Sequence, residues 1–287
     1  MQYYRLDDTA DGLVASTDDG VFDLGTAETP IGSFRALAAA AARSGSTIDA
    51  IAEAAIETSD ELPAGALSAA TLPARADEVW AAGVTYEISE QAREEESSEP
   101  DIYDHVYDAE RPEIFFKATP NRTVGHGESV GIREDSTWDV PEPELGVVLY
   151  RGEPVGYTIG NDMSSRSIEG ENPLYLPQAK VYDRCCSIGP SVASADSIGD
   201  PHDLEMRMSI ERDGGTRFEG STSTDQMKRS CEELTSYLTR HNAVPELAVL
   251  LTGTSLVPED DFTLQEGDTI AIEIDGIGRL ENDVIVV

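Results

Sequence analysis

Two glutamates separated by one residue lead an apolar run near the middle of the chain. Glu142 and Glu144 belong to the segment from Trp138 to Tyr150, and side chains two apart in a strand share one face. Two adjacent carboxylates repel each other unless a cation lies between them. Pro143 indicates a strand start or edge, where a site opens to solvent. The pair therefore suggests a cation site.

A third carboxylate joins this pair if the chain turns back after the apolar run. Arg151 to Pro154 is a turn signal, and a hairpin centred on residue 153 places Asp162 opposite Glu144; a register slip of one residue would turn Asp162 away. Three carboxylates suit Mg²⁺ or Mn²⁺, and no histidine or cysteine joins them to favour zinc. The alternative is a solvated strand edge, because the chain has 56 acidic residues.

Lysine is rare in this chain, which makes its positions informative. Of 20 cationic residues, 17 are arginine. Lys117 follows a buried-looking apolar strand, and Lys180 ends a segment bounded by prolines. The pKa of a lysine falls readily on burial, so lysine can serve as an acid or base. The alternative is a surface lysine with a buried stem, as expected for Lys228.

Charge excludes several classes of partner. The 287 residues carry a formal net charge of −36, which repels nucleic acid and anionic membranes. Molar salt reduces the Debye length to about 3 Å and screens such self-repulsion, so we expect a salt-adapted protein from a halophile. The alternative is an acidic protein that works at an ordinary salt concentration.

Location and cysteine chemistry follow from what the sequence lacks. It shows no signal-peptide pattern and no apolar stretch near the length of a membrane span, so we expect a cytoplasmic protein. Cys185, Cys186 and Cys231 lack metal-ligand spacing and are expected to be buried thiols.

The order of apolar segments predicts an α+β protein in two parts. Residues 1–72 form a small N-terminal α/β domain, with short strands over 3–24 and capped helices over 33–43 and 47–57. Residues 73–287 form a β-rich domain. Its strands are expected at 79–84, 114–118, 147–150, 157–159, 204–210, 270–274 and 284–287, and its helices at 86–96, 161–169 and 224–239. The acidic run 93–113 is an amphipathic lid or a solvated loop.

The ordered motifs of residues 79–287 resemble the fumarylacetoacetate hydrolase (FAH) superfamily. They are Ala82-Gly-Val-Thr-Tyr86, Pro112-Glu-Ile-Phe-Phe-Lys117, Glu142-Pro-Glu-Leu145, Gly156-Tyr-Thr-Ile-Gly-Asn-Asp162 with Arg166, Gln178-Ala-Lys180, Gly189-Pro190, Thr252-Gly-Thr254 and Gly267-Asp268. The resemblance implies a mixed β-roll core and a homodimer or homotetramer. It also implies Mg²⁺, with Mn²⁺ as a substitute, held by Glu142, Glu144 and Asp162.

Two longer strings, 106–117 and 168–180, resemble the archaeal 2-dehydro-3-deoxy-D-arabinonate dehydratases within that superfamily. Its hydrolases carry a catalytic histidine three residues after a tyrosine that corresponds to Tyr86, whereas this chain has Ser89 there. The resemblance therefore implies a hydro-lyase of oxidative pentose degradation. It converts a 2-keto-3-deoxy sugar acid, 2-dehydro-3-deoxy-D-pentonate, to 2,5-dioxopentanoate without a redox cofactor. The configuration at C4 and a six-carbon substrate stay open.

The resemblance and the chemistry together suggest roles for seven further residues. We expect Lys180 and Glu113 to share the proton transfers, and the others to bind substrate: Thr85, Ser89, Lys117, Arg166 and Thr254. Two alternatives stay open, since Glu113 can pair with Arg111 or Lys117, and Arg166 with a metal-binding carboxylate.

Two other functions compete with the dehydratase. A metal-dependent hydrolase of acylpyruvates or other β-diketo acids is the commoner activity of the superfamily, but the missing histidine disfavours it. A non-catalytic protein that binds divalent cations would have little use for Lys117 and Lys180.

Overall fold

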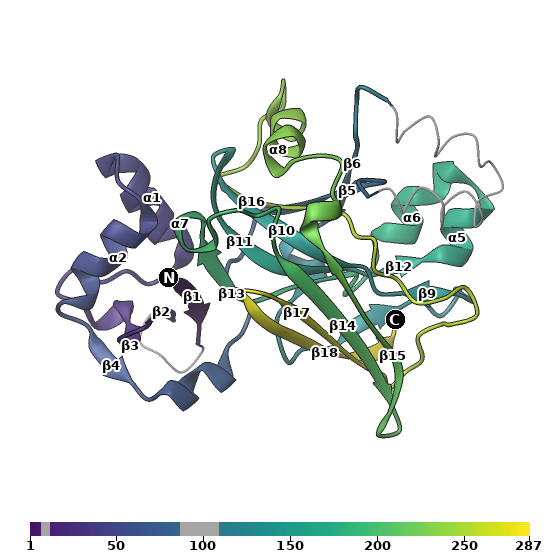
Figure 1. Cartoon of the computed structure of the whole chain (residues 1–287), viewed down its shortest axis with the longest axis horizontal. Helices are drawn as coiled ribbons and strands as arrows, with labels where there is room; N and C mark the ends of the chain where they lie inside the picture. The colour runs from purple at the N-terminus through teal and green to yellow at the C-terminus, as the bar shows by residue number, and fades with distance from the viewer. Residues whose placement is uncertain (7–11, 87–108) are drawn as a thin grey trace.

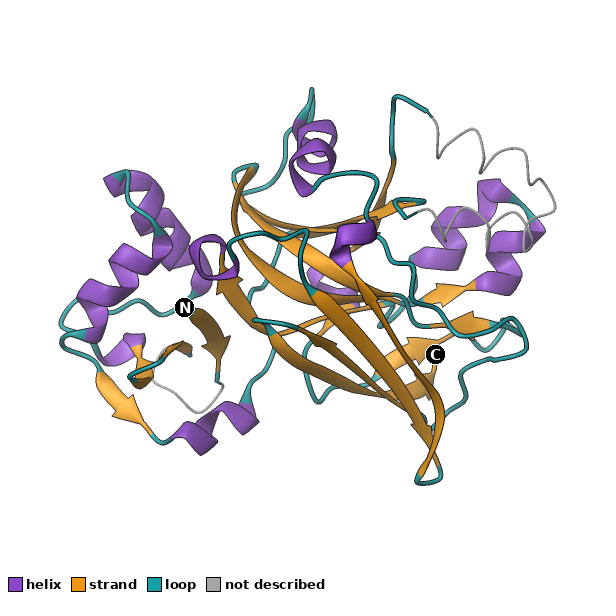
Figure 2. Ribbon diagram, in the orientation of Figure 1, coloured by secondary structure: helices purple, strands orange, loops and turns teal. Residues whose placement is uncertain are grey.

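The computed structural model describes residues 1–6, 12–86 and 109–287. Two large β-sheets form most of it, and short helices lie around them (Figures 1 and 2). This confirms the predicted α+β class. No helix in the described ranges is long and apolar enough to cross a membrane.

The larger sheet has eleven strands and carries the carboxylates. In spatial order its strands are β4 (Asp60–Leu62), β3 (Gly20–Asp23), β2 (Leu13–Thr17), β1 (Gln2–Arg5), β13 (Cys186–Ser194), β11 (Glu153–Asp162), β10 (Pro143–Tyr150), β16 (Leu247–Leu251), β5 (Glu78–Gly83) and β6 (Glu113–Ala118), with β7 (Thr123–Val124) paired to β13. Three of its central strands, β13, β10 and β16, are buried along their whole length, which explains their continuous apolar runs.

The second sheet has five strands, in the order β15 (Gly215–Ser223), β14 (Glu205–Arg212), β17 (Thr269–Ile274), β18 (Gly278–Val286) and β8 (Val130–Ile132). A two-stranded ribbon joins β9 (Asp139–Val140) to β12 (Ser164–Ser165). The helices are α1 (Phe34–Ser44), α2 (Ile48–Ile56), α5 (Arg166–Glu171), α6 (Leu176–Lys180), α7 (Ala195–Ile198) and α8 (Cys231–Thr239).

The N-terminal strands continue the larger sheet. The predicted strands and both helices are present, and Ser33 and Thr47 cap α1 and α2 through their side chains. Strand β1 pairs with β13, with Tyr3 opposite Val192. Backbone hydrogen bonds therefore cross the expected boundary at residue 72. The division into domains 1–72 and 73–287 stays a prediction.

The hairpin that positions the carboxylates differs in register from the expectation. Its turn is the pair Arg151 and Gly152, both with positive φ (53° and 86°), as a tight two-residue turn requires. A bulge then adds one residue to β11. The predicted pairing of Glu144 with Asp162 was wrong, because the Asp162 amide donates to the backbone carbonyl of Glu142 at 2.9 Å. The predicted register differs from the observed one by two residues, so the Asp162 side chain still lies on the predicted face of the sheet.

Several other segments depart from the prediction. The expected helix over 161–169 begins only at Arg166, because residues 161 and 162 end β11. The helix over 224–239 is a short 3₁₀ turn followed by α8. Three longer strands, β13, β15 and β16, were missed together with several strands of two or three residues, and Gly189-Pro190 within β13 disguised the first of them. Of the expected helix 86–96 only Tyr86 is described, where it forms an isolated β-bridge, and most of the acidic run 93–113 lies outside the described residues. The three cysteines are buried free thiols, as predicted.

Candidate active site

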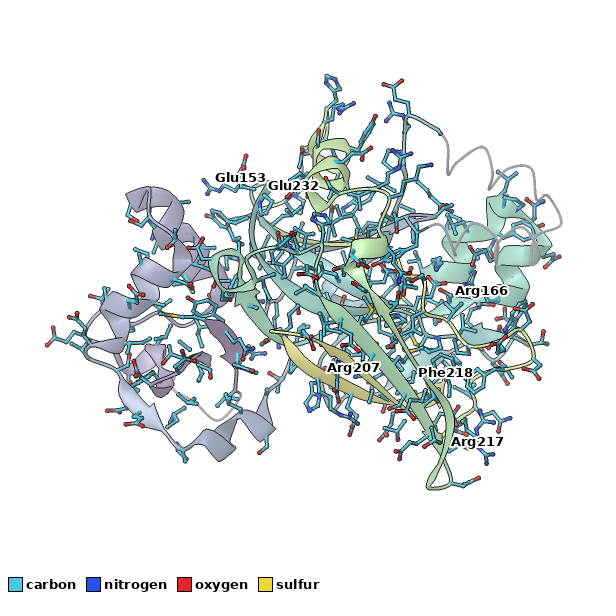
Figure 3. The ribbon with its side chains drawn as sticks, viewed as in Figure 1. Glu153, Arg166, Arg207, Arg217, Phe218 and Glu232 are labelled. Carbon is cyan, nitrogen blue, oxygen red and sulfur yellow. The ribbon has the colours of Figure 1, made fainter. Side chains whose placement is uncertain are left out.

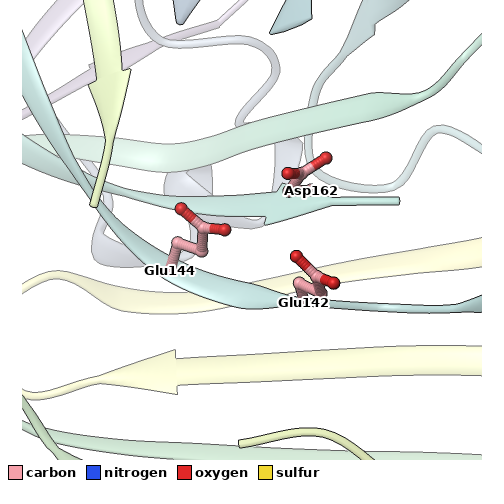
Figure 4. A group of neighbouring side chains, drawn as sticks. All are labelled: Glu142, Glu144 and Asp162. Carbon is pink, nitrogen blue, oxygen red and sulfur yellow. The ribbon is translucent and has the colours of Figure 1, made fainter. Parts of the chain in front are cut away.

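Three carboxylates meet at the ends of β10 and β11. Glu142 precedes β10, Glu144 lies on it, and Asp162 ends β11. One oxygen from each lies within 4.8 Å of the others, and Figure 4 shows the three side chains gathered together. All three are at least 96% buried, since their exposed fractions are 4%, 1% and 1%. Burial of three adjacent anions requires positive charge close by.

Lys180 supplies part of that charge from the end of α6. Its Nζ donates to Glu142 Oε2 at 2.8 Å, to Asp162 Oδ2 at 3.1 Å and to Ser164 Oγ at 2.5 Å. The side chain is 1% exposed, and the Phe115 ring lies 5.6 Å from the ammonium. Short α6 holds Lys180 against two of the three carboxylates.

Lys117 lies beneath the cluster on β6 and is fully buried. Its Nζ is 2.5 Å from Asp162 Oδ1 and donates to the carbonyls of Met163, at 2.8 Å, and Lys180. Burial acts to lower the pKa of Lys117, but the charges of Asp162, Cys185 and Cys186 together raise that pKa above its ordinary value. Lys117 does not line the cavity, so the structure does not support its expected contact with substrate.

Arg166 faces the cluster from the first position of α5, after the Ser165 cap. In Figure 3 it lies beside the helices at the right of the molecule. Its Nη2 is 2.9 Å from Glu142 Oε1, and its Nη1 is 3.8 Å from Glu169 Oε2. The pairing with a metal-site carboxylate, left open by the sequence, is therefore the one observed.

Glu144 is held by the loop that follows β16. The Gly253 amide donates to Glu144 Oε2 at 2.6 Å, and Thr85 Oγ1 donates to Thr252 O at 2.7 Å. Gly253 has φ +84°, and a Cβ there would lie 2.1 Å from Thr85 Oγ1, so only glycine fits. Thr85 supports this loop and does not line the cavity. Burial raises the pKa of Glu144 well above its ordinary value, and the charges of Asp162 and Glu142 raise it further.

The cluster suits a divalent cation by its donor set and its charge. The oxygens of Glu142, Glu144 and Asp162 are the hard ligands that Mg²⁺ and Mn²⁺ prefer. A cation among them would relieve the repulsion that raises the pKa of Glu144.

We expect the stabilisation by Mg²⁺ to grow with pH. Because the pKa of Glu144 is raised, protonation of this side chain stabilises the folded protein. This contribution to the free energy of unfolding is complete below the ordinary glutamate pKa of about 4.3, and it is lost as the pH rises through the raised value. Mg²⁺ binds the ionised form. Thermal melts in molar KCl from about pH 5 to about pH 8 should therefore show a widening Tm difference between samples with and without Mg²⁺. A constant difference would contradict this assignment.

A cavity of about 40 Å³ opens beside the cluster. Its wall consists of Ala82, Gly83, Val84, Glu113, Phe115, Glu142, Glu144, Asp162, Arg166, Glu169, Leu176, Lys180, Gly253, Thr254, Ser255 and Val257. The cavity thus unites four predicted residues outside the carboxylate cluster: Glu113, Lys180, Arg166 and Thr254. The sequence reasoning missed Glu169 and Ser255 on the wall. Ser89 lies outside the described residues.

Glu113 starts β6 directly opposite Gly83 of β5. A Cβ on Gly83 would lie 1.9 Å from Glu113 Oε2. The carboxylate therefore lies over the Gly83 backbone, in space that any larger residue would fill. Strand register and one glycine together bring this carboxylate to the cavity.

Comparisons with known proteins agree with this site. Residues 78–285 match the family model described as fumarylacetoacetate (FAA) hydrolase C-terminal. The chain is 59% identical, over the whole of both chains, to a "Probable 2-keto-3-deoxyxylonate dehydratase" of Haloferax volcanii. It is 48% identical to a "2-dehydro-3-deoxy-D-arabinonate dehydratase" of Saccharolobus solfataricus, over 73% of this chain and 72% of the relative.

A solved structure also resembles the chain over nearly its full length. It is described as "2-keto-3-deoxy-D-arabinonate dehydratase complexed with magnesium and 2,5-dioxopentanoate", and it covers 100% of this chain and 99% of its own, with a TM-score of 0.84 and 35% identity. The chain therefore belongs to the fumarylacetoacetate hydrolase family.

Proposed function

We propose that the chain is a magnesium-dependent hydro-lyase that converts 2-dehydro-3-deoxy-D-pentonate to 2,5-dioxopentanoate and water. The observation that carries the proposal is Lys180, a buried lysine on the cavity wall in contact with two of the three clustered carboxylates. The names of the Haloferax and Saccharolobus relatives support the substrate class. A 2-keto-3-deoxypentonate keeps C4 as its one stereocentre, so the D-xylonate and D-arabinonate series give the same compound.

The residues of the cavity wall can perform the proton transfers. A divalent cation held by Glu142, Glu144 and Asp162 supplies Lewis acidity beside the 2-keto acid end of the substrate. Lys180 and Glu113 share removal of a C3 proton and protonation of the departing C4 hydroxyl. Removal of a C5 proton and return of a proton to C3 then give the enol of the product aldehyde, which a final protonation at C4 completes. One water is lost, and no electrons are exchanged with a cofactor.

The surrounding residues hold these groups in place. Thr254 and Arg166 line the cavity and can donate hydrogen bonds to the substrate, while Arg166 also fixes Glu142. Lys117 fixes Asp162 from below. Substrate binding by Ser89 stays a prediction.

We also propose that the protein works as a homodimer or homotetramer in the cytoplasm of a salt-rich cell, without nucleic-acid or membrane partners. The net charge of −36 supports this setting, as does the Haloferax relative.

Two substrates offered in parallel distinguish the dehydratase from a β-diketo-acid hydrolase. In molar KCl with Mg²⁺, we expect turnover of 2-dehydro-3-deoxy-D-pentonate and none of acetylpyruvate, because hydrolysis requires a base for water at the place of Ser89. A coupled aldehyde dehydrogenase reports the first reaction, and loss of the enol absorbance reports the second. Turnover of acetylpyruvate alone would replace the proposal with the hydrolase.

A further inference from the structure

The open ends of β5 and β6 form one side of the cavity, but no tight turn joins them. Gly83 and Val84 lie at the end of β5, and Glu113 and Phe115 at the start of β6. Residues 84–112 intervene. A short hairpin turn normally fixes the register at such an end, and a connection of this length is not such a turn. The β5–β6 ladder pairs Glu113 with Gly83, and contacts from another segment can strengthen this end of the ladder.

One distant stretch, residues 227–229, contacts both the segment that follows β5 and the segment that precedes β6. Met227 forms an isolated β-bridge with Tyr86, and the Lys228 amide donates to Thr85 O at 2.9 Å. These bonds hold the segment that leaves β5. The neighbouring Arg229 side chain donates from Nη2 to Ala109 O and from Nη1 to Glu110 O at 3.4 Å. Those bonds hold the segment that enters β6.

Arg229 is itself fixed. It is 8% exposed, and its Nη1 lies 2.6 Å from Glu233 Oε1 on α8. The helix is capped by Ser230, while His202 Nε2 accepts from the Cys231 amide at 3.0 Å. A guanidinium presents several donors in one rigid plane, so it can bind two carbonyls and a carboxylate together.

We infer that Arg229 is a positioning residue for Glu113, and through it for proton transfer. The two carbonyls that Arg229 binds belong to Ala109 and Glu110, a few residues before Glu113. Tyr237 of α8 donates to the same Glu110 carbonyl at 2.8 Å. Arg229 therefore does for β5 and β6 what a tight turn does in a short hairpin. Its effect on turnover rests on the proposed function, but its effect on the backbone does not.

Arg229→Met tests the inference, with Arg229→Lys as the conservative variant. Arg217→Met is the matched control, since Arg217 is exposed on the β14–β15 hairpin (Figure 3). We expect Arg229→Met to lower kcat by about 10-fold to 100-fold, the size of effect that small misplacements produce. KM and Mg²⁺ affinity should change little, because Arg229 contacts none of Glu142, Glu144 and Asp162 and does not line the cavity. Arg229→Lys should give an intermediate kcat, and Arg217→Met should match the wild type.

Amide hydrogen exchange of residues 112–118, read by mass spectrometry in molar KCl, keeps the test independent of turnover. Faster exchange there in Arg229→Met, with lower kcat and unchanged Mg²⁺ affinity, supports the inference. Unchanged exchange overturns it, and so does faster exchange with wild-type kcat. A parallel loss of kcat and Mg²⁺ affinity would indicate general destabilisation and also overturn it. If the wild type turns over no sugar acid, the proposed function fails, and the exchange data alone decide whether Arg229 holds this end of β6.

Discussion

Lys180→Ala is expected to lower kcat by about 10²–10⁴-fold, the range that a positioned acid or base contributes. The substitution removes from the cavity wall an ammonium that contacts Glu142, Asp162 and Ser164. Mg²⁺ binding should persist, because the three carboxylates remain and lose a competing cation. Steady-state kinetics in molar KCl and titration with Mg²⁺ measure the two properties separately.

Lys180→Arg separates proton transfer from electrostatics. Arginine keeps a positive charge near Glu142 and Asp162, but its guanidinium does not release a proton at neutral pH. We expect this variant to be as inactive as Lys180→Ala. Activity near the wild type in Lys180→Arg would show that only the charge matters, and wild-type turnover in Lys180→Ala would remove Lys180 from the mechanism.

Lys117→Met should lower the free energy of unfolding by about 3–5 kcal/mol, the cost of removing one partner of a buried ion pair. The fully buried ammonium lies 2.5 Å from Asp162 and donates to two carbonyls. Methionine keeps most of the length of the side chain without its charge, and it leaves that carboxylate and both carbonyls without this donor. Because the pKa of Lys117 is raised, the pair contributes fully at neutral pH and is lost only as pH rises through the raised value. Urea unfolding at constant molar KCl, without Mg²⁺, measures the change.

A double substitution controls for simple loss of packing. If the penalty arises from loss of the Lys117–Asp162 interaction, Asp162→Asn should cost less in the Lys117→Met background than in the wild type. Additive losses would mean that Lys117 and Asp162 are not coupled. A loss in Lys117→Met comparable to that of an exposed ion pair, below about 1 kcal/mol, would contradict the structural role of Lys117.

The sequence allowed the parts of the site set by local pattern to be predicted. Alternation in a strand puts Glu142 and Glu144 on one face, and a hairpin returns Asp162 to them. The register was two residues off because the bulge and the two-residue turn depend on backbone angles at Arg151 and Gly152. The face was still correct, since side chains alternate with a period of two.

Contacts between distant segments could not be predicted in the same way. The Gly253 amide binds Glu144 because β16 pairs beside β10, and no local pattern announces that pairing. Ser164 and Glu169 contact Lys180 and Arg166 through short elements of only a few residues. The rarity of lysine drew attention to Lys117, but its place against Asp162 and below the cavity depends on how β6 packs.

The most direct test of the proposed function follows the carbon skeleton of the substrate by NMR. Purified protein in about 2 M KCl, a concentration that screens charges beyond a few ångströms, is incubated with 2-dehydro-3-deoxy-D-pentonate with and without Mg²⁺. We predict Mg²⁺-dependent formation of 2,5-dioxopentanoate with the five-carbon chain intact and, in D₂O, deuterium at C3 and C4. Unchanged substrate, or cleavage of the chain into pyruvate and glycolaldehyde, would contradict the proposed dehydration.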